Sequence, residues 1–372
     1  MIYLDSAANT PVDEKVLDDF VDVTKRFIAN PNSSHELGQL AKKQIDDCQE
    51  YISKTFDCPK EGIIFTSGSS ESNNLVIKGI AEKNKEFGNH IIISAIEHSS
   101  IVAPCNYLTS HGYDVSVIDI HEDGKIDLEE LKKTINDKTI LVSMCYVDGE
   151  LGTIEPIKEI AKIVKEYPNC KFHTDATQAV GKIPVDFSMC DFVTFAPHKF
   201  FGLNGFGVLL NMHNDKLVPL IHGGKSTTIY RSGTPVTANV VALNTALKEA
   251  ITHLDERFKY IKSLNTYLKN ELSKLSFVHI NTPSDAMPGT LNISIKDKNA
   301  KEIVKGLAKK EIYVSTTTAC SQGDAPSKSV LAITKDMNLA SNSIRISMSQ
   351  LTTREELDTF LKELVNEYNK AQ

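Results

Sequence analysis

The stretch 191–210, DFVTFAPHKFFGLNGFGVLL, contains two short apolar runs joined by a glycine-punctuated segment. The runs DFVTFA and GFGVLL are rich in β-branched and aromatic residues, which predicts two buried strands. Between them stands one lysine, Lys199, and lysine is seldom buried without a partner. Two interpretations are open. Its stem lies on apolar surface while its amine reaches water, or the amine is desolvated and ready to form a Schiff base.

Runs of the same type recur between residues 62 and 212 and alternate with amphipathic helical segments. These runs are GIIFT, HIIISA, DVSVIDI, TILVSMCYV, KFHTDA, DFVTFA and GFGVLLNM. Segment 156–167 is typical of the helices, because Ile157, Ile160, Ala161 and Val164 share one face. The alternation predicts an α/β fold in which helices cover a mainly parallel, seven-stranded sheet.

The rest of the chain predicts a smaller α+β domain. A long helical pattern over 238–275 leads into it and is expected to link the two domains. Beyond this pattern, TLNISI, IYVSTTT and SIRISMS are typical of strands, and helices are expected near 299–310 and 353–370.

Composition restricts the classes of function. With 372 residues, of which 41% are hydrophobic and 24% charged, the chain is typical of an ordered globular protein. The net charge of −7 and the lack of a basic patch argue against nucleic acid as a partner. No run is long enough to span a bilayer and the start does not resemble a secretion signal, so we expect a cytoplasmic protein without a membrane partner.

The seven cysteines have no CxxC or Cys/His spacing, so neither a metal site nor a disulfide framework is expected. Cys145, Cys170 and Cys190 lie in or next to strand-like runs and are interpreted as small buried hydrophobic residues. Cys320 differs, because it lies in the polar stretch TTTACSQGDAPSKS. Such a thiol is expected to be exposed and is either reactive or an idle surface residue.

Polar groups follow three predicted strands, at the end where open α/β sheets bind ligands. Ser69 and Ser70 precede a helix and could cradle a phosphate, although serines there are often simple caps. Asp175 and Gln178 follow a second strand, and Lys199 follows a third. A lysine for an aldehyde, a carboxylate for a ring nitrogen and an anion cradle are what pyridoxal phosphate (PLP) needs.

Several motifs strengthen this interpretation. In chain order they are LDSAANTP, NPNSSHELG, FTSGSSESNNLVIKG, EHSSI, HTDATQAVGK, APHKFFG, RSGTP, TACS and SIRISMS. Together they resemble the cysteine desulfurases, which are class-V members of the fold type I PLP enzymes. The resemblance implies a large domain, placed at 13–258, and a small domain formed by 1–12 and 259–372. It also implies a homodimer with active sites at the subunit interface.

The resemblance implies cofactor roles for several positions. Lys199 matches the Schiff-base lysine, and Asp175 matches the partner of the pyridine nitrogen. His98 resembles the histidine that stacks on the ring, and Gln178 a donor to the ring hydroxyl. The residues that match phosphate contacts are Ser69, Ser70, His198 and Thr234, the last from the neighbouring subunit.

The remaining roles concern the substrate and the sulfur. Arg345 resembles the arginine that binds the substrate carboxylate, with Asn32 assisting, and Cys320 resembles the catalytic cysteine. The implied reaction converts L-cysteine to L-alanine and leaves a persulfide on Cys320, which passes the sulfur to an acceptor. An iron–sulfur scaffold or a thiolation protein would suit that acceptor. Two alternatives are a related PLP lyase or transaminase, for example one acting on selenocysteine, and a degenerate regulatory copy.

The match is incomplete beside the predicted cofactor. The family usually has V-N-N-E-x-G where this chain has Val147–Gly152, and Gly149 replaces an asparagine that donates to the ring hydroxyl. The missing hydrogen bond is expected to cost about 1 kcal/mol of cofactor binding. Asp148 could substitute only through water, since a carboxylate repels a phenolate. Ala196 likewise stands where the family commonly has a serine.

Overall fold

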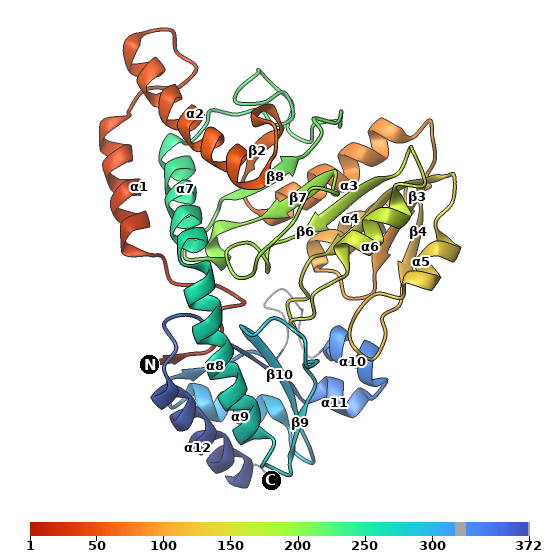
Figure 1. Cartoon of the computed structure of the whole chain (residues 1–372), viewed down its shortest axis with the longest axis vertical. Helices are drawn as coiled ribbons and strands as arrows, with labels where there is room; N and C mark the ends of the chain where they lie inside the picture. Colours follow the sequence, from red (N-terminus) through yellow and green to blue (C-terminus); the bar gives the residue numbers. More distant parts are fainter. Residues whose placement is uncertain (317–324, 371–372) are drawn as a thin grey trace.

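The computed structural model describes residues 1–316 and 325–370 and contains a twisted seven-stranded sheet with the order β2-β8-β7-β6-β5-β3-β4 (Figure 1). The strands are β2 (Ile63–Thr66), β3 (His90–Ser94), β4 (Asp114–Ile118), β5 (Thr139–Cys145), β6 (Lys171–Asp175), β7 (Phe192–Phe195) and β8 (Gly207–Asn211). Only β8 runs antiparallel to its neighbours, β2 and β7. The predicted α/β class with a mainly parallel sheet is confirmed.

Helices cover both faces of this sheet because alternate strand residues point to opposite sides. On β3, Ile92 packs into one core, and Ile91 and Ile93 pack into another. The helices on the Ile92 side are α1 (Glu14–Arg26), α2 (Glu36–Phe56), α6 (Ile157–Val164) and α7 (Thr237–Thr252). The opposite face is covered by α3 (Ser69–Asn84) and α4 (Ser99–Thr109), whereas α5 (Leu128–Thr134), which follows β4, packs Leu131 into the core on the Ile92 side. The four apolar residues expected on the buried face of α6 are all buried.

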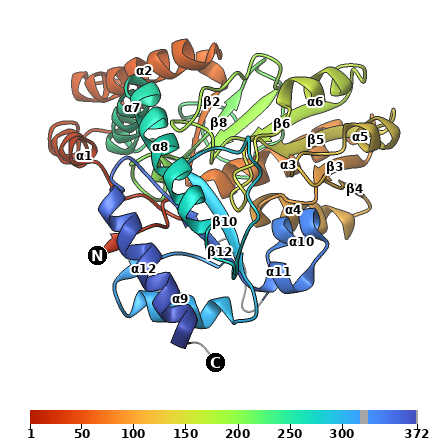
Figure 2. The ribbon, with the colours of Figure 1, turned by 60° about the horizontal axis from the view of Figure 1, so that its bottom comes forward.

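A second, smaller layer has its own hydrophobic core. Its antiparallel sheet has the order β12-β10-β9, formed by β9 (Val278–Ile280), β10 (Thr290–Ile295) and β12 (Ser343–Ser347). The accompanying helices are α8 (Leu254–Leu272), α9 (Ala300–Ala308), α10 (Lys328–Thr334), α11 (Met337–Ser341) and α12 (Arg354–Lys370). Figure 2 shows α9 and α12 on the outer side of this sheet, whereas α10 and α11 lie beside the large layer.

The two ends of the chain meet in this smaller layer. Strand β1 (Ile2–Tyr3) pairs in parallel with β11 (Ile312–Tyr313), and Ser347 N–H donates to Leu4 O at 2.8 Å. Strands are confirmed in TLNISI and SIRISMS. In IYVSTTT only the two residues of β11 form a strand, and its last two residues lie outside the described part of the chain.

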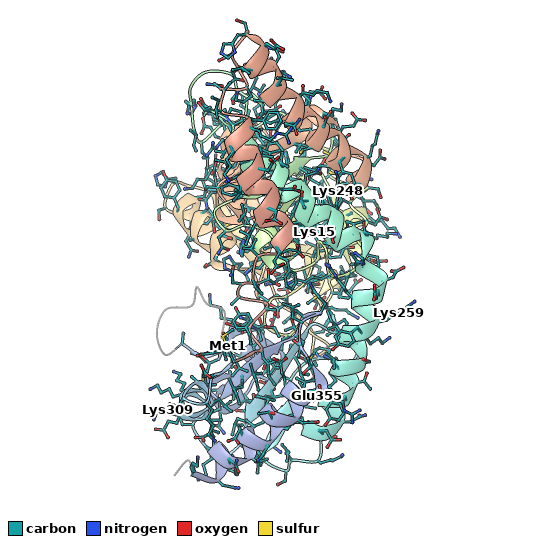
Figure 3. The ribbon with its side chains drawn as sticks, turned by 90° about the vertical axis from the view of Figure 1, so that its left-hand side faces the viewer. Met1, Lys15, Lys248, Lys259, Lys309 and Glu355 are labelled. Atoms are coloured by element: carbon teal, nitrogen blue, oxygen red, sulfur yellow. The ribbon has the colours of Figure 1, made fainter. Side chains whose placement is uncertain are left out.

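The long helical pattern over 238–275 is interrupted. Helix α7 ends at Thr252 and α8 begins at Leu254, with His253 between them at φ −102° and ψ 12°. Figure 3 shows Lys248 of α7 and Lys259 of α8 along the same edge of the molecule, so the two helices still connect the layers. The predicted domain boundary between residues 258 and 259 lies within α8. The limits of the two domains stay a prediction. Among the described residues, no helix has both the length and the apolar character needed to cross a membrane.

Candidate active site

Four strands bring the predicted site residues to one edge of the large sheet. Strands β2, β3, β6 and β7 point in the same direction, so their carboxyl ends lie together. Helix α3 begins after β2, His98 follows β3, Asp175 ends β6 and Lys199 follows β7. The parallel topology therefore gathers groups that are far apart in the sequence.

Lys199 ends a short 3₁₀ turn that follows β7, and it is half-buried. Its amine donates hydrogen bonds to the backbone carbonyls of Ala7 at 2.9 Å and Ala8 at 2.6 Å. These carbonyls belong to the N-terminal segment that links the smaller layer to the site. Of the two interpretations of Lys199, the structure favours an amine held inside the protein over one that reaches bulk water.

Asp175 is 8% exposed, and both of its carboxylate oxygens accept hydrogen bonds. Oδ1 accepts from Thr177 N–H at 3.0 Å, and Oδ2 accepts from Asn73 Nδ2 at 2.7 Å. Asn73 is fully buried in α3 and was not singled out from the sequence. The hydrogen bond from Asn73 holds the side chain of Asp175 in place at the end of β6.

His98 caps the start of α4, and its Nδ1 accepts from Ser100 N–H at 3.2 Å. Burial lowers the pKa of His98; the charge of Asp175 opposes this shift and that of Lys199 adds to it. At neutral pH the lowered pKa favours an uncharged ring.

Gln178 is held at both ends of its amide. Nε2 donates to Ala7 O at 2.9 Å, and Oε1 accepts from Lys182 Nζ at 2.6 Å. Since the amide nitrogen has two hydrogens, one remains for another acceptor. Lys182 was not predicted to be a site residue, although its position four residues after Gln178 could have indicated that the two side chains meet.

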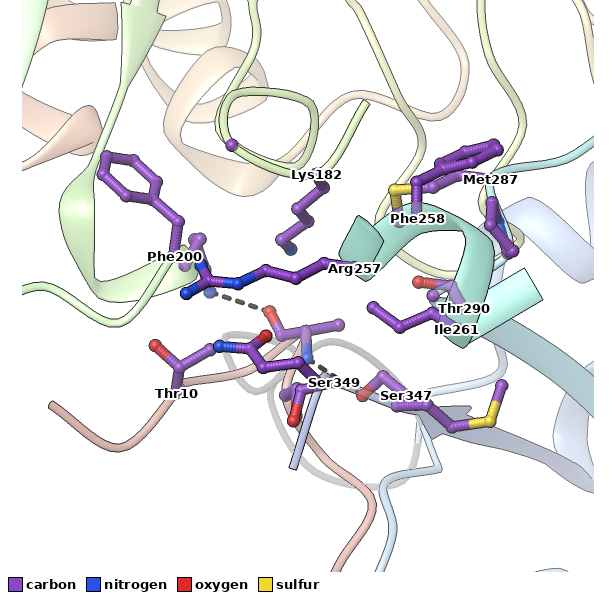
Figure 4. A pocket seen from close by; sticks show the side chains of 18 of the residues that line it. Thr10, Lys182, Phe200, Arg257, Phe258, Ile261, Met287, Thr290, Ser347 and Ser349 are labelled. Carbon is purple, nitrogen blue, oxygen red and sulfur yellow. Dashed lines mark hydrogen bonds between the residues drawn. The ribbon is translucent and has the colours of Figure 1, made fainter. Parts of the chain in front are cut away.

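Lys182 lines a cavity of about 50 Å³ on the side of Lys199 that faces α8. Figure 4 shows Lys182 and Arg257 pointing toward the same space, which has room for a few water molecules. Burial, and then the charges of Lys199 and Arg345, lowers the pKa of Lys182 to about 7. Near neutral pH the Lys182 amine is therefore only partly protonated. The positive charge in this cavity, next to the proposed catalytic amine of Lys199, thus changes with pH.

Ser69 and Ser70 form the first turn of α3, where backbone N–H groups lack helical partners. Gly207 at the start of β8 packs tightly there, since a Cβ would come within 2.4 Å of the backbone of Gly68. His198 is half-buried on the neighbouring 3₁₀ turn, and burial lowers its pKa to about 4, helped by Lys199. One carboxylate lies in the same turn: Glu71 accepts from Ser67 N–H at 2.7 Å and forms an ion pair with Arg231 at 3.0 Å, which offsets its charge.

Arg345 lies on β12 and is only 2% exposed. Its guanidinium donates to Gly149 O at 3.1 Å and to Asp5 Oδ1 at 2.9 Å. It therefore joins three segments: the N-terminal segment, the loop after β5 and the smaller sheet. Asp5 is a further site residue that the sequence did not reveal.

Three predicted residues are not joined to this group by any described contact. Asn32 is exposed, and the connection between α1 and α2 that contains it lies at the end of the molecule away from β10 (Figure 1). Thr234 is exposed and lines a separate cavity of about 120 Å³ together with Ser67 and Gly205. Cys320 lies outside the described residues.

The loop after β5 contains Asp148 and Gly149, the two positions at which this chain lacks the asparagines of the family motif. A Cβ at Gly149 would lie 3.6 Å from Gln178 Nε2, so this position faces the predicted ring-hydroxyl site. Asp148 does not substitute there, because its buried carboxylate accepts from Glu150 N–H and from the hydroxyl of Ser329, both at 3.0 Å. The hydrogen bond lost at Gly149 is therefore not replaced by its neighbour.

The six cysteines within the described ranges are all buried, which confirms the interpretation of Cys145, Cys170 and Cys190. Burial raises the pKa of each thiol; for Cys105 it reaches about 12. None of these six is a ready thiolate at neutral pH. In residues 1–316 and 325–370, no cluster of His, Cys, Asp and Glu could hold a metal ion.

Comparison with known proteins assigns the chain to a family. The model of the aminotransferase class-V family matches residues 2–360. A protein named cysteine desulfurase IscS from Dictyoglomus turgidum is 36% identical over 362 residues, which cover 96% of this chain and 92% of that protein. This family implies PLP as cofactor in general.

Solved structures agree with this relationship. A NifS-like protein superposes with a TM-score of 0.93 at 32% identity and covers 98% of both chains. A structure described as SspA in complex with cysteine gives a TM-score of 0.83 at 31% identity and covers 94% of this chain and 99% of that one. The chain belongs to the class-V aminotransferase family and, within it, to the cysteine desulfurases.

Proposed function

We propose that this chain is a PLP-dependent cysteine desulfurase, which converts L-cysteine to L-alanine and transfers the sulfur to the thiol of Cys320. The observation that carries the proposal is that the parallel strands β3, β6 and β7 bring His98, Asp175 and Lys199 to one edge of the large sheet. The conversion also agrees with relatives named cysteine desulfurase and with the cysteine-bound structural neighbour.

The residues at the strand ends fit PLP. The amine of Lys199 would hold its aldehyde, and Asp175, fixed by Asn73, would face its ring nitrogen. The remaining N–H of Gln178 suits the ring hydroxyl. The first turn of α3 and His198 would hold the phosphate, with Thr234 of the partner subunit assisting.

We assign substrate binding to Arg345. Its planar guanidinium suits a carboxylate, and its burial strengthens that interaction. When bound, PLP supplies an electron sink for the substrate carbon. The freed amine of Lys199 then moves the α-proton.

The sulfur step requires a thiolate, and we assign it to Cys320. Its sulfur attacks the sulfur of the substrate, so that a sulfur–sulfur bond forms and the carbon–sulfur bond breaks. The electron pair of the broken bond stays with the carbon, which takes up a proton to become the methyl group of alanine. Cys320 is left as a persulfide, and an acceptor protein, such as an iron–sulfur scaffold or a thiolation protein, would then take the sulfur.

A homodimer is part of the proposal. Apolar side chains are exposed on α1 and α2, where a monomer would leave them in water: Leu17 is 42% exposed, Val21 45% and Leu37 54%. Ile229, near Thr234, is 63% exposed. Such a surface suits a subunit interface that reaches the phosphate site. A cytoplasmic location stays a prediction.

The test is product stoichiometry. Enzyme saturated with PLP and given L-cysteine and a reductant is expected to release sulfide and alanine in equal amounts. Lys199→Ala is expected to abolish both products, and Cys320→Ser to abolish the persulfide. Enzyme that holds the cofactor but forms neither product would refute the proposed function.

A further inference from the structure

A chain of hydrogen bonds joins Asp175 to His98 through Asn73, already described as a donor to Asp175, and through the side chain of Ser100, which has no part in the reaction as described so far. Nδ2 of Asn73 lies 2.7 Å from Asp175 Oδ2 and 2.8 Å from Ser100 Oγ. Ser100 Oγ in turn lies 2.8 Å from His98 Nδ1. Asn73 is fully buried and Ser100 is 8% exposed, so bulk water does not compete for these contacts.

The direction of each hydrogen bond follows from the chemistry of the groups. A carboxylate oxygen only accepts, so Asn73 must present its amide nitrogen, and not its oxygen, to Asp175. The second hydrogen of that nitrogen is directed at Ser100 Oγ. Since this oxygen accepts from Asn73, the single hydrogen of its hydroxyl is left for His98 Nδ1.

The backbone gives independent evidence for the same tautomer. The N–H of Ser100, which can only donate, lies 3.2 Å from His98 Nδ1. Nδ1 therefore accepts from two donors and carries no hydrogen. A neutral imidazole has one N–H group, which must then be on Nε2.

We propose that Asn73 and Ser100 are positioning residues, which hold His98 as the Nε2–H tautomer and tie the orientation of its ring to the carboxylate of Asp175. In this tautomer Nε2 donates a hydrogen bond and has no lone pair that could take a proton. His98 thus acts on the substrate as a donor, and removal of a proton is left to Lys199. This role rests on the proposed desulfurase reaction, whereas the tautomer itself does not.

Nitrogen-15 NMR of the cofactor-free enzyme with labelled histidine tests the tautomer directly. The signals of His98 are identified by their loss in His98→Gln, and in the wild type we expect the hydrogen on Nε2. Asn73→Ala frees Ser100 Oγ to accept, and Ser100→Ala removes one donor. In both variants we expect a detectable share of the Nδ1–H form and a rise in the pKa of His98, because a donor to the neutral form is lost.

Two further variants separate positioning from a general structural effect. Ser100→Thr keeps the hydroxyl group, so in this variant we expect the same tautomer and the same pKa of His98 as in the wild type. Ser99→Ala is the matched control, because Ser99 is exposed in the same turn and its side chain makes no hydrogen bond within the described residues. If Asn73→Ala does not fold, Ser100→Ala and Ser100→Thr decide the question.

A wild-type hydrogen on Nδ1 would overturn the proposal. So would His98 signals in Asn73→Ala and Ser100→Ala that match those of Ser99→Ala. Because these measurements use enzyme without cofactor or substrate, they stand whether or not the protein proves to be a desulfurase. Conversely, product formation with L-cysteine tests the function without reference to the tautomer.

Discussion

At position 149 a glycine leaves space beside the amide that we assign to the cofactor's ring hydroxyl. A Cβ there would lie 3.6 Å from Gln178 Nε2, which is ordinary contact, so a larger side chain fits. Gly149→Asn is expected to lower the Kd for PLP about fivefold, as one added hydrogen bond would. Gly149→Ala, which fits equally but cannot donate, serves as the control in the same absorbance titration. Equal Kd values for the two variants would contradict this role of position 149.

Strand ends made some site residues readable from the sequence. Lys199 and Asp175 each follow an apolar run, and parallel strands place such positions at one edge, whereas His98 was indicated only by the family resemblance. Asn73 was not readable, because it lies within a helix and its partner Asp175 is 102 residues away. Asp5 and Arg345 are 340 residues apart, and no local pattern announces their ion pair. Which side chains meet is decided by the packing of whole elements.

The start of helix α10 is fastened to the loop after β5 by two buried carboxylates. Ser329 donates to Asp148 at 3.0 Å, and the hydroxyl of Ser327 donates to Glu150. Burial, and then the charge of Glu150, raises the pKa of Asp148 to about 6. A carboxyl whose pKa is higher in the folded protein than in the unfolded chain destabilises the fold when it ionises. The free energy of unfolding therefore falls as pH rises from about 4 to about 6.

Asp148→Asn tests this cost, because asparagine keeps an acceptor for Glu150 N–H and cannot ionise. Relative to the wild type, we expect a gain of up to about 3 kcal/mol in the free energy of unfolding at about pH 7.5, and of about 1 kcal/mol at about pH 4.5. Urea unfolding at both pH values measures the difference. Asp137→Asn, at an exposed position, is expected to change neither value. A gain that does not depend on pH would contradict the assignment to Asp148.

Elements with a strong periodic pattern were predicted well, and their limits less so. The apolar face of α6 was readable because its four residues recur at helical spacing. The break at His253 was not, because neither proline nor glycine marks it and the pattern continues into α8. Strand β11 is shorter than its β-branched run suggests, because its pairing partner β1 has only two residues. Tertiary partners, and not local propensity, set these limits.

Across the whole molecule, the N-terminal segment connects the smaller layer to the proposed catalytic amine. Its strand β1 pairs with β11, and its Asp5 carboxylate binds Arg345. The carbonyl oxygen of Ala7 accepts a hydrogen bond from the Lys199 amine. Further along the same segment, Thr10 N–H donates a hydrogen bond at 3.0 Å to the carbonyl oxygen of His198, in the turn that contains Lys199. The position of Lys199 therefore depends on contacts between the layers.

If residues of both subunits form each active site, a dimer of two different variants can regain activity that neither variant has in full on its own. Within one chain, Thr234 lines a cavity with Ser67, two residues before α3, so it could serve its own phosphate site or that of the partner subunit. If Thr234 acts across the interface, a mixed dimer of Lys199→Ala and Thr234→Val has one site with both residues intact. Unfolding the two variants, mixing them equally and refolding them is then expected to raise the rate of alanine formation above the mean of the separately refolded variants by up to about a quarter of the wild-type rate, because half of the dimers are mixed and each has one intact site. Each variant refolded alone gives the baseline. Activity that stays at this baseline, although mixed dimers are detected by mass, would show that Thr234 serves the site of its own subunit.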